Sequence, residues 1–216
     1  MKIPPTLPFL LLLATASCGQ GQSPSQRDST AQTLPDSLPT PSILGLKISD
    51  AALSLTHDTV QYDPAYFAIA YPHGDVPADR GVCTDVVIRA YRKLGIDLQK
   101  EVHEDMKAHF EAYPKIWGLK KTDTNIDPRR VPNLMTFFSR HGAQQPITQN
   151  GADYLPGDIV TWSLDGGLTH IGIVVNLKSA DQKRYLIVHN IGRGQEVSDC
   201  LFEYAVTGHY RYTGGR

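Results

Sequence analysis

The feature of this chain that most constrains its fold is the order in which segments with helix-like and strand-like spacing of apolar residues follow one another. Between residues 83 and 141, apolar side chains recur at spacings of three and four, which is typical of helices that bury one face. From residue 158 onward they form short apolar runs between polar or Gly-rich turns, which is typical of strands. We expect helices over 48–55, 83–94, 98–112 and 131–141, and strands over 158–162, 170–176, 185–189 and 208–212. Helices followed by strands predict an α+β domain with an antiparallel sheet.

The first residues have the pattern of a secretion signal. One Lys precedes a short apolar core and small residues that end at Cys18, and this core is too short to span a bilayer. The small residues resemble a bacterial lipoprotein signal, in which Cys18 becomes the acylated N-terminus, although Thr15 stands where Leu is usual. We therefore expect export to the periplasm or cell envelope and a lipid anchor, with an ordinary cleaved signal or an uncleaved anchor as alternatives.

Composition separates a signal (1–18), a linker (19–41) and one domain (42–216). The linker is mainly Gln, Ser, Thr, Pro and Asp, and such a segment buries too little apolar surface to become ordered. Ser49 or Asp50 is a candidate cap for the first helix of the domain. The net charge is −1 without a Lys or Arg run, so neither nucleic acid nor an anionic lipid surface is a favoured partner. We expect a monomer that meets the membrane only through its lipid.

Export would leave two further thiols, Cys83 and Cys200. A disulfide between them is one interpretation, because an exported protein meets an oxidising compartment. We favour chemistry at Cys83 and a buried, inert thiol at Cys200, because a domain of this size seldom needs a single bridge.

The position of Cys83 is suited to a nucleophile. It opens the helix predicted over 83–94, where unpaired N–H groups and the helix dipole stabilise a thiolate. His170, in the strand predicted over 170–176, would lower the thiol pKa further as an imidazolium. A third polar group must hold that imidazole, and His189 and Asn190 are the candidates. They are neighbours on one strand and face opposite sides, so only one of them can reach.

These residues resemble two known families. Tyr71, Cys83 at a helix start, the strand over 157–162, the run 169–174 and a strand ending at His189 are similar to the papain-like NlpC-type cell-wall cysteine peptidases, over about residues 60–212. The segments 83–86, 123–127, 129–134 and 188–192 resemble more closely the bacterial domain-of-unknown-function family 1287, whose members are exported.

The resemblance implies a papain-like fold with Cys83 as nucleophile, His170 as general base and His189 as orienting residue, Asn190 being the alternative. It further implies attack on an amide carbonyl, a thioester that water hydrolyses, and an oxyanion site at the backbone N–H of Cys83. The cell-wall peptidases usually have Asp before the cysteine and Ser-Gly after it. Here Val82 precedes it and Thr84-Asp85 follow, which leaves the substrate open.

Three further residues are candidates for substrate binding. Tyr71 would lie near the thiol or pack in the core. Arg129 and Arg130 suit the carboxylates of peptidoglycan stem peptides, and the alternative is solvated surface or an ion pair with Asp127. For Asp85 we expect an ion pair with Arg89, four residues further along the helix.

We expect no metal and no cofactor, because paired-Cys and His-x-x-x-His spacings and Gly-rich phosphate-binding loops are missing from the sequence. The expected function is an exported cysteine hydrolase that cleaves an amide bond in peptidoglycan stem peptides. A non-catalytic peptidoglycan-binding envelope module is one alternative, and an acyltransferase or lipid hydrolase on the same fold is another.

Overall fold

The computed structural model describes residues 40–215. The predicted signal, Cys18 and nearly all of the predicted linker lie outside these residues. The helices of the described part are α1 (Ile43–Leu55), α2 (Cys83–Arg92), α3 (Leu98–Ala108) and α4 (Val131–Arg140), with short 3-10 helices η1 (Phe110–Ala112), η2 (Asp127–Arg129), η3 (Gly151–Asp153) and η4 (Asp165–Gly167). Within residues 40–215, no helix has the length and apolar character that crossing a bilayer requires.

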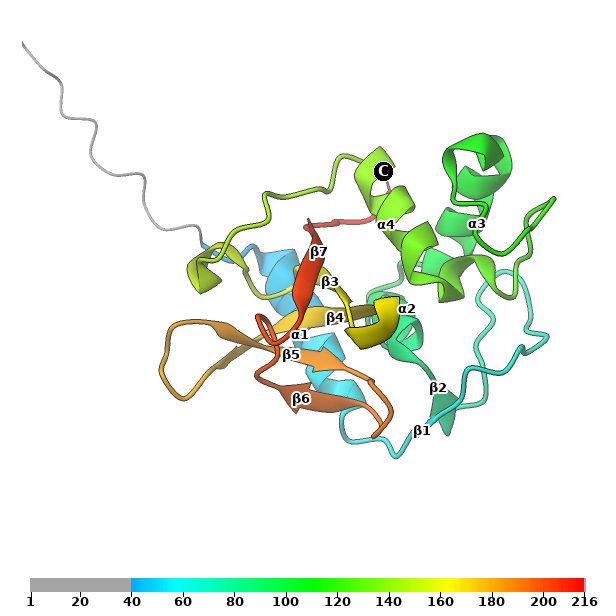
Figure 1. The fold of residues 1–216 in the computed structure, drawn as a ribbon. Helices are drawn as coiled ribbons and strands as arrows, with labels where there is room; N and C mark the ends of the chain where they lie inside the picture. Colours follow the sequence, from blue (N-terminus) through cyan, green and yellow to red (C-terminus); the bar gives the residue numbers. More distant parts are fainter. Residues whose placement is uncertain (1–39, 216) are drawn as a thin grey trace, which may run out of the picture. The chain divides into compact units, whose positions relative to one another are not determined.

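Five strands form an antiparallel sheet in the order β6-β5-β4-β3-β7 (Figure 1). They are β3 (Ile159–Ser163), β4 (Thr169–Lys178), β5 (Tyr185–His189), β6 (Glu196–Ser198) and β7 (Ala205–Tyr210). A separate pair, β1 (Gln61–Tyr62) and β2 (Arg80–Gly81), is parallel and brings the loop after α1 beside the residues that precede α2.

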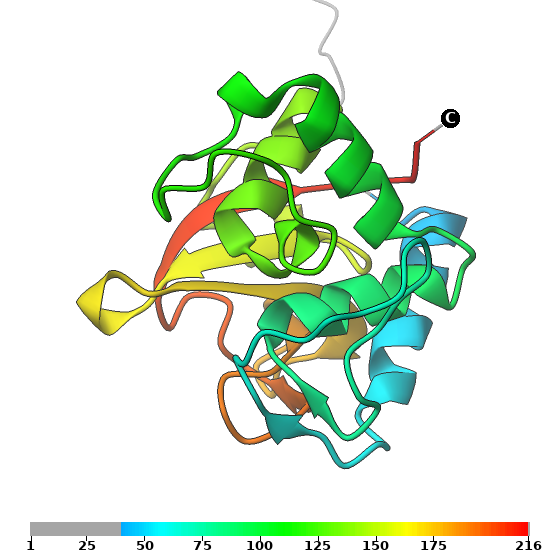
Figure 2. The same ribbon diagram turned by 90° about the vertical axis from the view of Figure 1, so that its right-hand side faces the viewer.

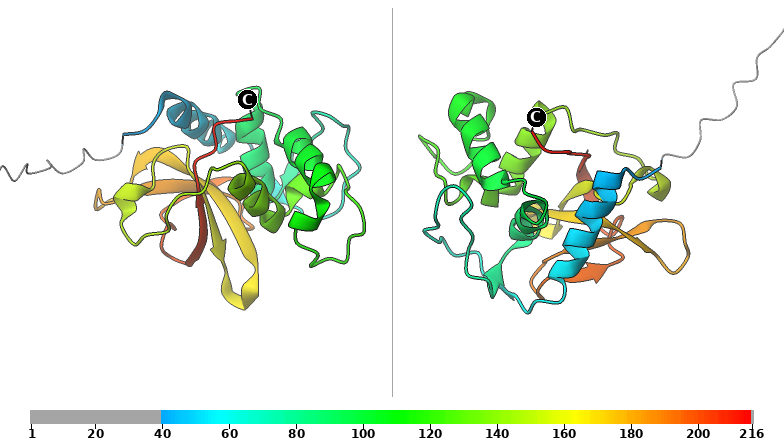
Figure 3. Two further views of the ribbon diagram at one scale, coloured as in Figure 1. Left: turned by 90° about the horizontal axis from the view of Figure 1, so that it is seen from above. Right: turned by 180° about the vertical axis from the view of Figure 1, so that it is seen from behind.

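The central strand β4 has helices on one face and a smaller cluster on the other. Helices α1 and α2 contact each other and β4 (Figures 2 and 3). Because side chains alternate along a strand, Ile173 joins the helix-facing core, and Val174 joins the smaller cluster around Trp162. Because both faces of β4 are buried, the sequence of this strand is a continuous apolar run and does not alternate between apolar and polar residues.

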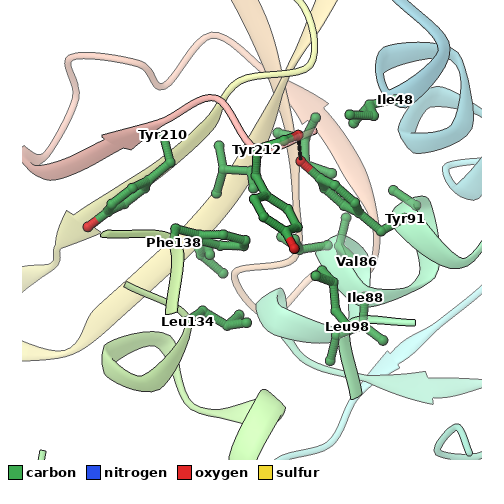
Figure 4. Packing of buried hydrophobic residues seen from close by; sticks show 14 of the residues in the cluster. Ile48, Val86, Ile88, Tyr91, Leu98, Leu134, Phe138, Tyr210 and Tyr212 are labelled. Carbon is green, nitrogen blue, oxygen red and sulfur yellow. Dashed lines mark hydrogen bonds between the residues drawn. The ribbon is translucent and has the colours of Figure 1, made fainter. Parts of the chain in front are cut away.

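Aromatic side chains close the main core where the C-terminal segment crosses the helices. Phe138, Tyr212 and Tyr91 pack together in this region, and the Tyr91 hydroxyl donates a hydrogen bond of 2.9 Å to the carbonyl oxygen of Tyr212 (Figure 4). This contact ties the end of the chain to α2, the helix that begins at Cys83.

The α+β class with helices before an antiparallel sheet is confirmed, and so is a cysteine at the start of a helix that packs on that sheet. The start of the first helix was predicted wrongly: α1 begins at Ile43, and the Ser42 hydroxyl accepts the cap hydrogen bond from Gly45 N–H. Ser49 and Asp50 lie inside α1. Strands β1, β2 and β6, of two or three residues each, were not predicted.

Candidate active site

Cys83 is the first residue of α2 and is 7% exposed. The backbone N–H groups of Ile171, Thr84 and Cys83 itself act on the sulfur in the direction that lowers its pKa. Ile171 directly follows His170 in β4, so the helix start and this strand meet at the thiol. Burial raises the pKa of Cys83 to about 12, and these N–H groups only partly oppose the effect. The predicted lowering of the thiol pKa is therefore wrong, because desolvation outweighs the helix N-terminus.

His170 and His189 are in direct contact. The distance from His170 Nε2 to His189 Nδ1 is 2.9 Å, and the two rings meet edge to face. Burial, with a contribution from His189, lowers the pKa of His170 to about 3, and burial also lowers the pKa of His189. Both rings are therefore neutral at pH 7. His189 occupies the Nε2 side of His170, so Nδ1 is the ring nitrogen that this contact leaves open.

A glycine makes room for this pair. Gly172 lies across from the end of β5, and a Cβ atom there would come within 2.6 Å of the Ile187 side chain and 3.1 Å of the His189 Cβ. A larger residue would push β5 away from β4, and His189 away from His170.

The hydrogen bonds continue beyond the two histidines. His189 Nε2 contacts the Ser198 hydroxyl on β6, and a side-chain hydrogen bond from Ser198 lowers the pKa of Cys200, although burial raises that pKa overall to about 11. Cys83 and Cys200 are both free, so the disulfide interpretation does not hold. Asn190, the alternative candidate for contact with His170, instead donates a hydrogen bond of 3.3 Å from its Nδ2 to the Gly81 carbonyl oxygen.

Cys83 lies in the wall of a cleft of about 340 Å³. The lining residues are Tyr62, Pro64, Val82, Cys83, Thr84, Trp117, Ile126, Arg129, Arg130, Val131, Pro132 and Thr169. Tyr62 and Trp117 were not among the predicted site residues. Tyr62 reaches the cleft through the β1–β2 pairing, and burial, with a smaller electrostatic contribution from Cys83, raises its pKa. Neither residue stands in a local pattern that would have identified it.

Tyr71 is not among the lining residues of this cleft. Its ring contacts that of His103 on α3, with centroids 5.1 Å apart, and 39% of the residue is exposed. Burial and the nearby Glu104 raise its pKa. The prediction that Tyr71 binds substrate is not supported in this arrangement.

The two predicted substrate-binding arginines have different environments. Arg129 forms a buried ion pair with Asp85, with an Nε–Oδ1 distance of 3.0 Å and both side chains 3% exposed. The predicted Asp85–Arg89 pair is wrong, because Arg89 binds Asp75 instead. Arg129 is thus held by the protein itself, whereas Arg130 lines the cleft with its guanidinium carbon 4.0 Å from the centroid of the Trp117 ring.

Within residues 40–215, no three His, Cys, Asp or Glu side chains are grouped so that they could hold a metal ion. The cleft wall carries the buried Cys83 thiol and the two arginines, whereas His170 and His189 are not among its lining residues, and the ring centroid of His170 lies 5.8 Å from that of Trp162.

Comparison with known proteins gives three similarities. The model of the family described as domain of unknown function (DUF1287) matches residues 49–212. Uncharacterized protein YijF of Escherichia coli (strain K12) is 53% identical over 167 residues, which are 77% of this chain and 81% of that protein. The solved structure of NlpC1 from Trichomonas vaginalis aligns with 78% of this chain and 44% of its own length, at 16% identity and a TM-score of 0.41. This chain therefore spans less than half the length of that structure.

Proposed function

The chain belongs to the DUF1287 family, and from its cleft we propose that it is an exported cysteine hydrolase that cleaves an amide bond in peptidoglycan stem peptides. One observation carries the proposal. The thiol of Cys83 lies at the start of α2, in a cleft, where the backbone N–H of Ile171 acts to lower its pKa, and Ile171 directly follows His170, whose Nε2 contacts His189.

Because the thiol and the imidazoles are neutral in the resting protein, the first step is general-base catalysis rather than attack by a preformed thiolate. His170 Nδ1 takes the thiol proton as the Cys83 sulfur attacks the amide carbonyl carbon. The carbonyl oxygen becomes an oxyanion, which the Cys83 backbone N–H stabilises at the helix N-terminus.

The second half of the cycle returns the site to its initial state. His170 gives its proton to the amide nitrogen as the C–N bond breaks, and the amine leaves. Water then attacks the thioester and loses a proton to His170, and the released thiolate recovers that proton. The net reaction adds one water across one amide bond.

The test is mass spectrometry of muropeptides incubated with the wild-type chain and with Cys83→Ala. We expect fragments whose masses identify a single cleaved amide bond, and no such fragments with Cys83→Ala. Cys200→Ser is the matched control, because it changes the other buried thiol, which is outside the cleft, and retains an oxygen that can accept a hydrogen bond from Ser198. Equal turnover by Cys83→Ala would overturn the assignment.

The high pKa of Cys83 favours a second candidate, a peptidoglycan-binding module without turnover. A thiol that remains protonated at pH 7 reacts slowly with alkylating reagents unless a base takes its proton. If His170 acts as the base, alkylation of Cys83 by iodoacetamide should slow in His170→Gln. The same slow rate in both proteins, together with unchanged muropeptides, would favour the binding module.

A further inference from the structure

Arg130 has hydrogen-bonding capacity that the protein does not use. It is the last residue before α4, half-buried in the cleft wall, and its Nη1 is buried without a hydrogen-bond partner among residues 40–215. Thr84 Oγ1, beside the thiol, is a second buried polar atom in that wall without such a partner. Buried polar groups are usually satisfied, so unused groups in a cleft indicate a ligand that completes them.

The charges around the cleft favour an anion. None of its lining residues is Asp or Glu, and the charge of Arg129 is compensated by Asp85 at 3.0 Å. Burial lowers the pKa of Arg130, whereas Asp127 and Asp123 raise it, and a guanidinium remains protonated at any pH the protein meets. Arg130 is thus the cation of the cleft wall that a ligand can pair with.

Trp117 fixes the orientation of this cation. The guanidinium carbon of Arg130 lies over the Trp117 ring, 4.0 Å from its centroid, while 42% of Trp117 remains exposed. Stacking on a ring leaves the edge of the guanidinium, where the N–H donors lie, free for in-plane hydrogen bonds. A carboxylate matches this edge because its two oxygens accept two parallel N–H bonds.

We propose that Arg130, stacked on Trp117, is a subsite for a substrate carboxylate beside the Cys83 thiol, so that the cleft selects acidic peptides. This inference rests on the proposed hydrolase and names its substrate class. The carboxylate on the Arg130 side fixes the peptide along the cleft, and thereby selects which of its amide carbonyls reaches the sulfur.

Binding is measured first, in the full chain carrying Cys83→Ala, so that the peptide stays intact. The probes are the synthetic peptide L-alanyl-γ-D-glutamyl-L-lysyl-D-alanine and the same peptide with its carboxyl groups converted to carboxamides, titrated by calorimetry. A charge-assisted pair predicts roughly 10- to 100-fold tighter binding of the acid than of the amide. Adding Arg130→Met should abolish this preference, and Arg130→Lys should retain only part of it.

Lys178→Met is the matched control. It removes a cation 3.5 Å from the ring of Tyr185, on β4 and β5 outside the cleft, and should leave the preference unchanged. Circular dichroism of each variant verifies folding, and Trp117→Leu offers a second route if Arg130→Met does not fold. The subsite would be overturned if the Cys83→Ala chain, with Arg130 intact, bound both peptides with equal affinity or bound neither of them measurably.

Turnover by the Cys83-containing chain separates this proposal from the hydrolase. Equal cleavage of the acid and the amide would leave the hydrolase standing and overturn the subsite. A preference for the acid that depends on Arg130, without cleavage of either peptide, would support the subsite and overturn the hydrolase.

Discussion

Ser198 is the residue at the far end of the hydrogen-bonded chain that begins at His170. For His170 Nδ1 to accept the thiol proton, Nε2 must carry hydrogen and donate it to His189 Nδ1 at 2.9 Å. His189 then carries its hydrogen on Nε2 and donates it to the Ser198 hydroxyl. The side chain of Ser198 also acts to lower the pKa of Cys200, so in this tautomer the sulfur of Cys200 is the acceptor for the hydroxyl hydrogen.

Replacing Ser198 by Ala should lower kcat roughly 3- to 10-fold with little change in KM, because one hydrogen bond that orients the base is lost. Ser198→Thr should restore most of the rate. The readout specific to tautomers is the 15N NMR shift of the His170 and His189 ring nitrogens, which should show mixed tautomers in Ser198→Ala. Ser54→Ala removes a hydroxyl that bonds within α1 and should change neither quantity. Unchanged ring-nitrogen shifts in Ser198→Ala would contradict this role.

At the scale of single residues, the helix and strand patterns placed Cys83 at the start of α2 and His170 and His189 on β4 and β5, where the two histidines are in contact. Their catalytic roles stay a prediction. The pKa of the Cys83 thiol was predicted in the wrong direction, because a periodic pattern shows that a helix face is buried but not how much desolvation a thiol at its start undergoes. Tyr62 reaches the cleft on the two-residue strand β1, and Trp117 reaches it on a turn; both segments are too short or too irregular to have a periodic pattern.

At the scale of elements, one buried ion pair joins the start of α2 to the start of α4. Asp85 accepts from the N–H of Val82 at 2.7 Å and from the Arg129 guanidinium. The guanidinium also donates to the carbonyl oxygens of Ala65 and Asp63, in the loop that follows β1. Three segments far apart in the sequence are thereby fixed around the residue that precedes Cys83.

Arg129→Met should lower the free energy of unfolding by about 3–5 kcal/mol, because it leaves the Asp85 carboxylate buried without its cation. Urea denaturation at pH 7 measures the change. Arg140→Met is the control: its partner Asp105 bonds at 2.8 Å, but at the surface, where water screens the pair, so the loss should be small. Equal losses in the two variants would mean that the buried pair has no special role.

The elements that were predicted well are those whose own periodicity is long enough to be specific. Helices α2 and α4 start at the predicted residues, and β5 has the predicted bounds. The start of α1 and the strand β6 depend on partners elsewhere in the chain. Ser49, a predicted cap, instead accepts the Asn176 N–H at 2.8 Å, and β6 exists through its pairing with β5.

At the scale of the whole molecule, the site that we propose for catalysis makes the stability of the described domain depend on pH at both extremes. The pKa of His170 is lowered to about 3 from 6.5, so the unfolded chain binds more protons than the folded one between these values. Stability is therefore fully present above pH 6.5 and is lost as the pH falls towards 3. The pKa of Cys83 is raised from 9.0 to about 12, so its contribution is lost as the pH rises through that interval.

Two variants separate these effects and serve as controls for each other. His170→Gln should flatten the dependence of the unfolding free energy on pH between 3 and 6.5, and leave the dependence above pH 9 unchanged. Cys83→Ala should do the reverse. The measurement is urea denaturation of each protein across the pH range, compared as slopes, since both substitutions change the absolute stability of a buried site. If the unfolding free energy of His170→Gln had the same slope between pH 3 and 6.5 as that of the wild type, the imidazole of His170 would not be buried and neutral. General-base attack by a protonated thiol would then be contradicted as well.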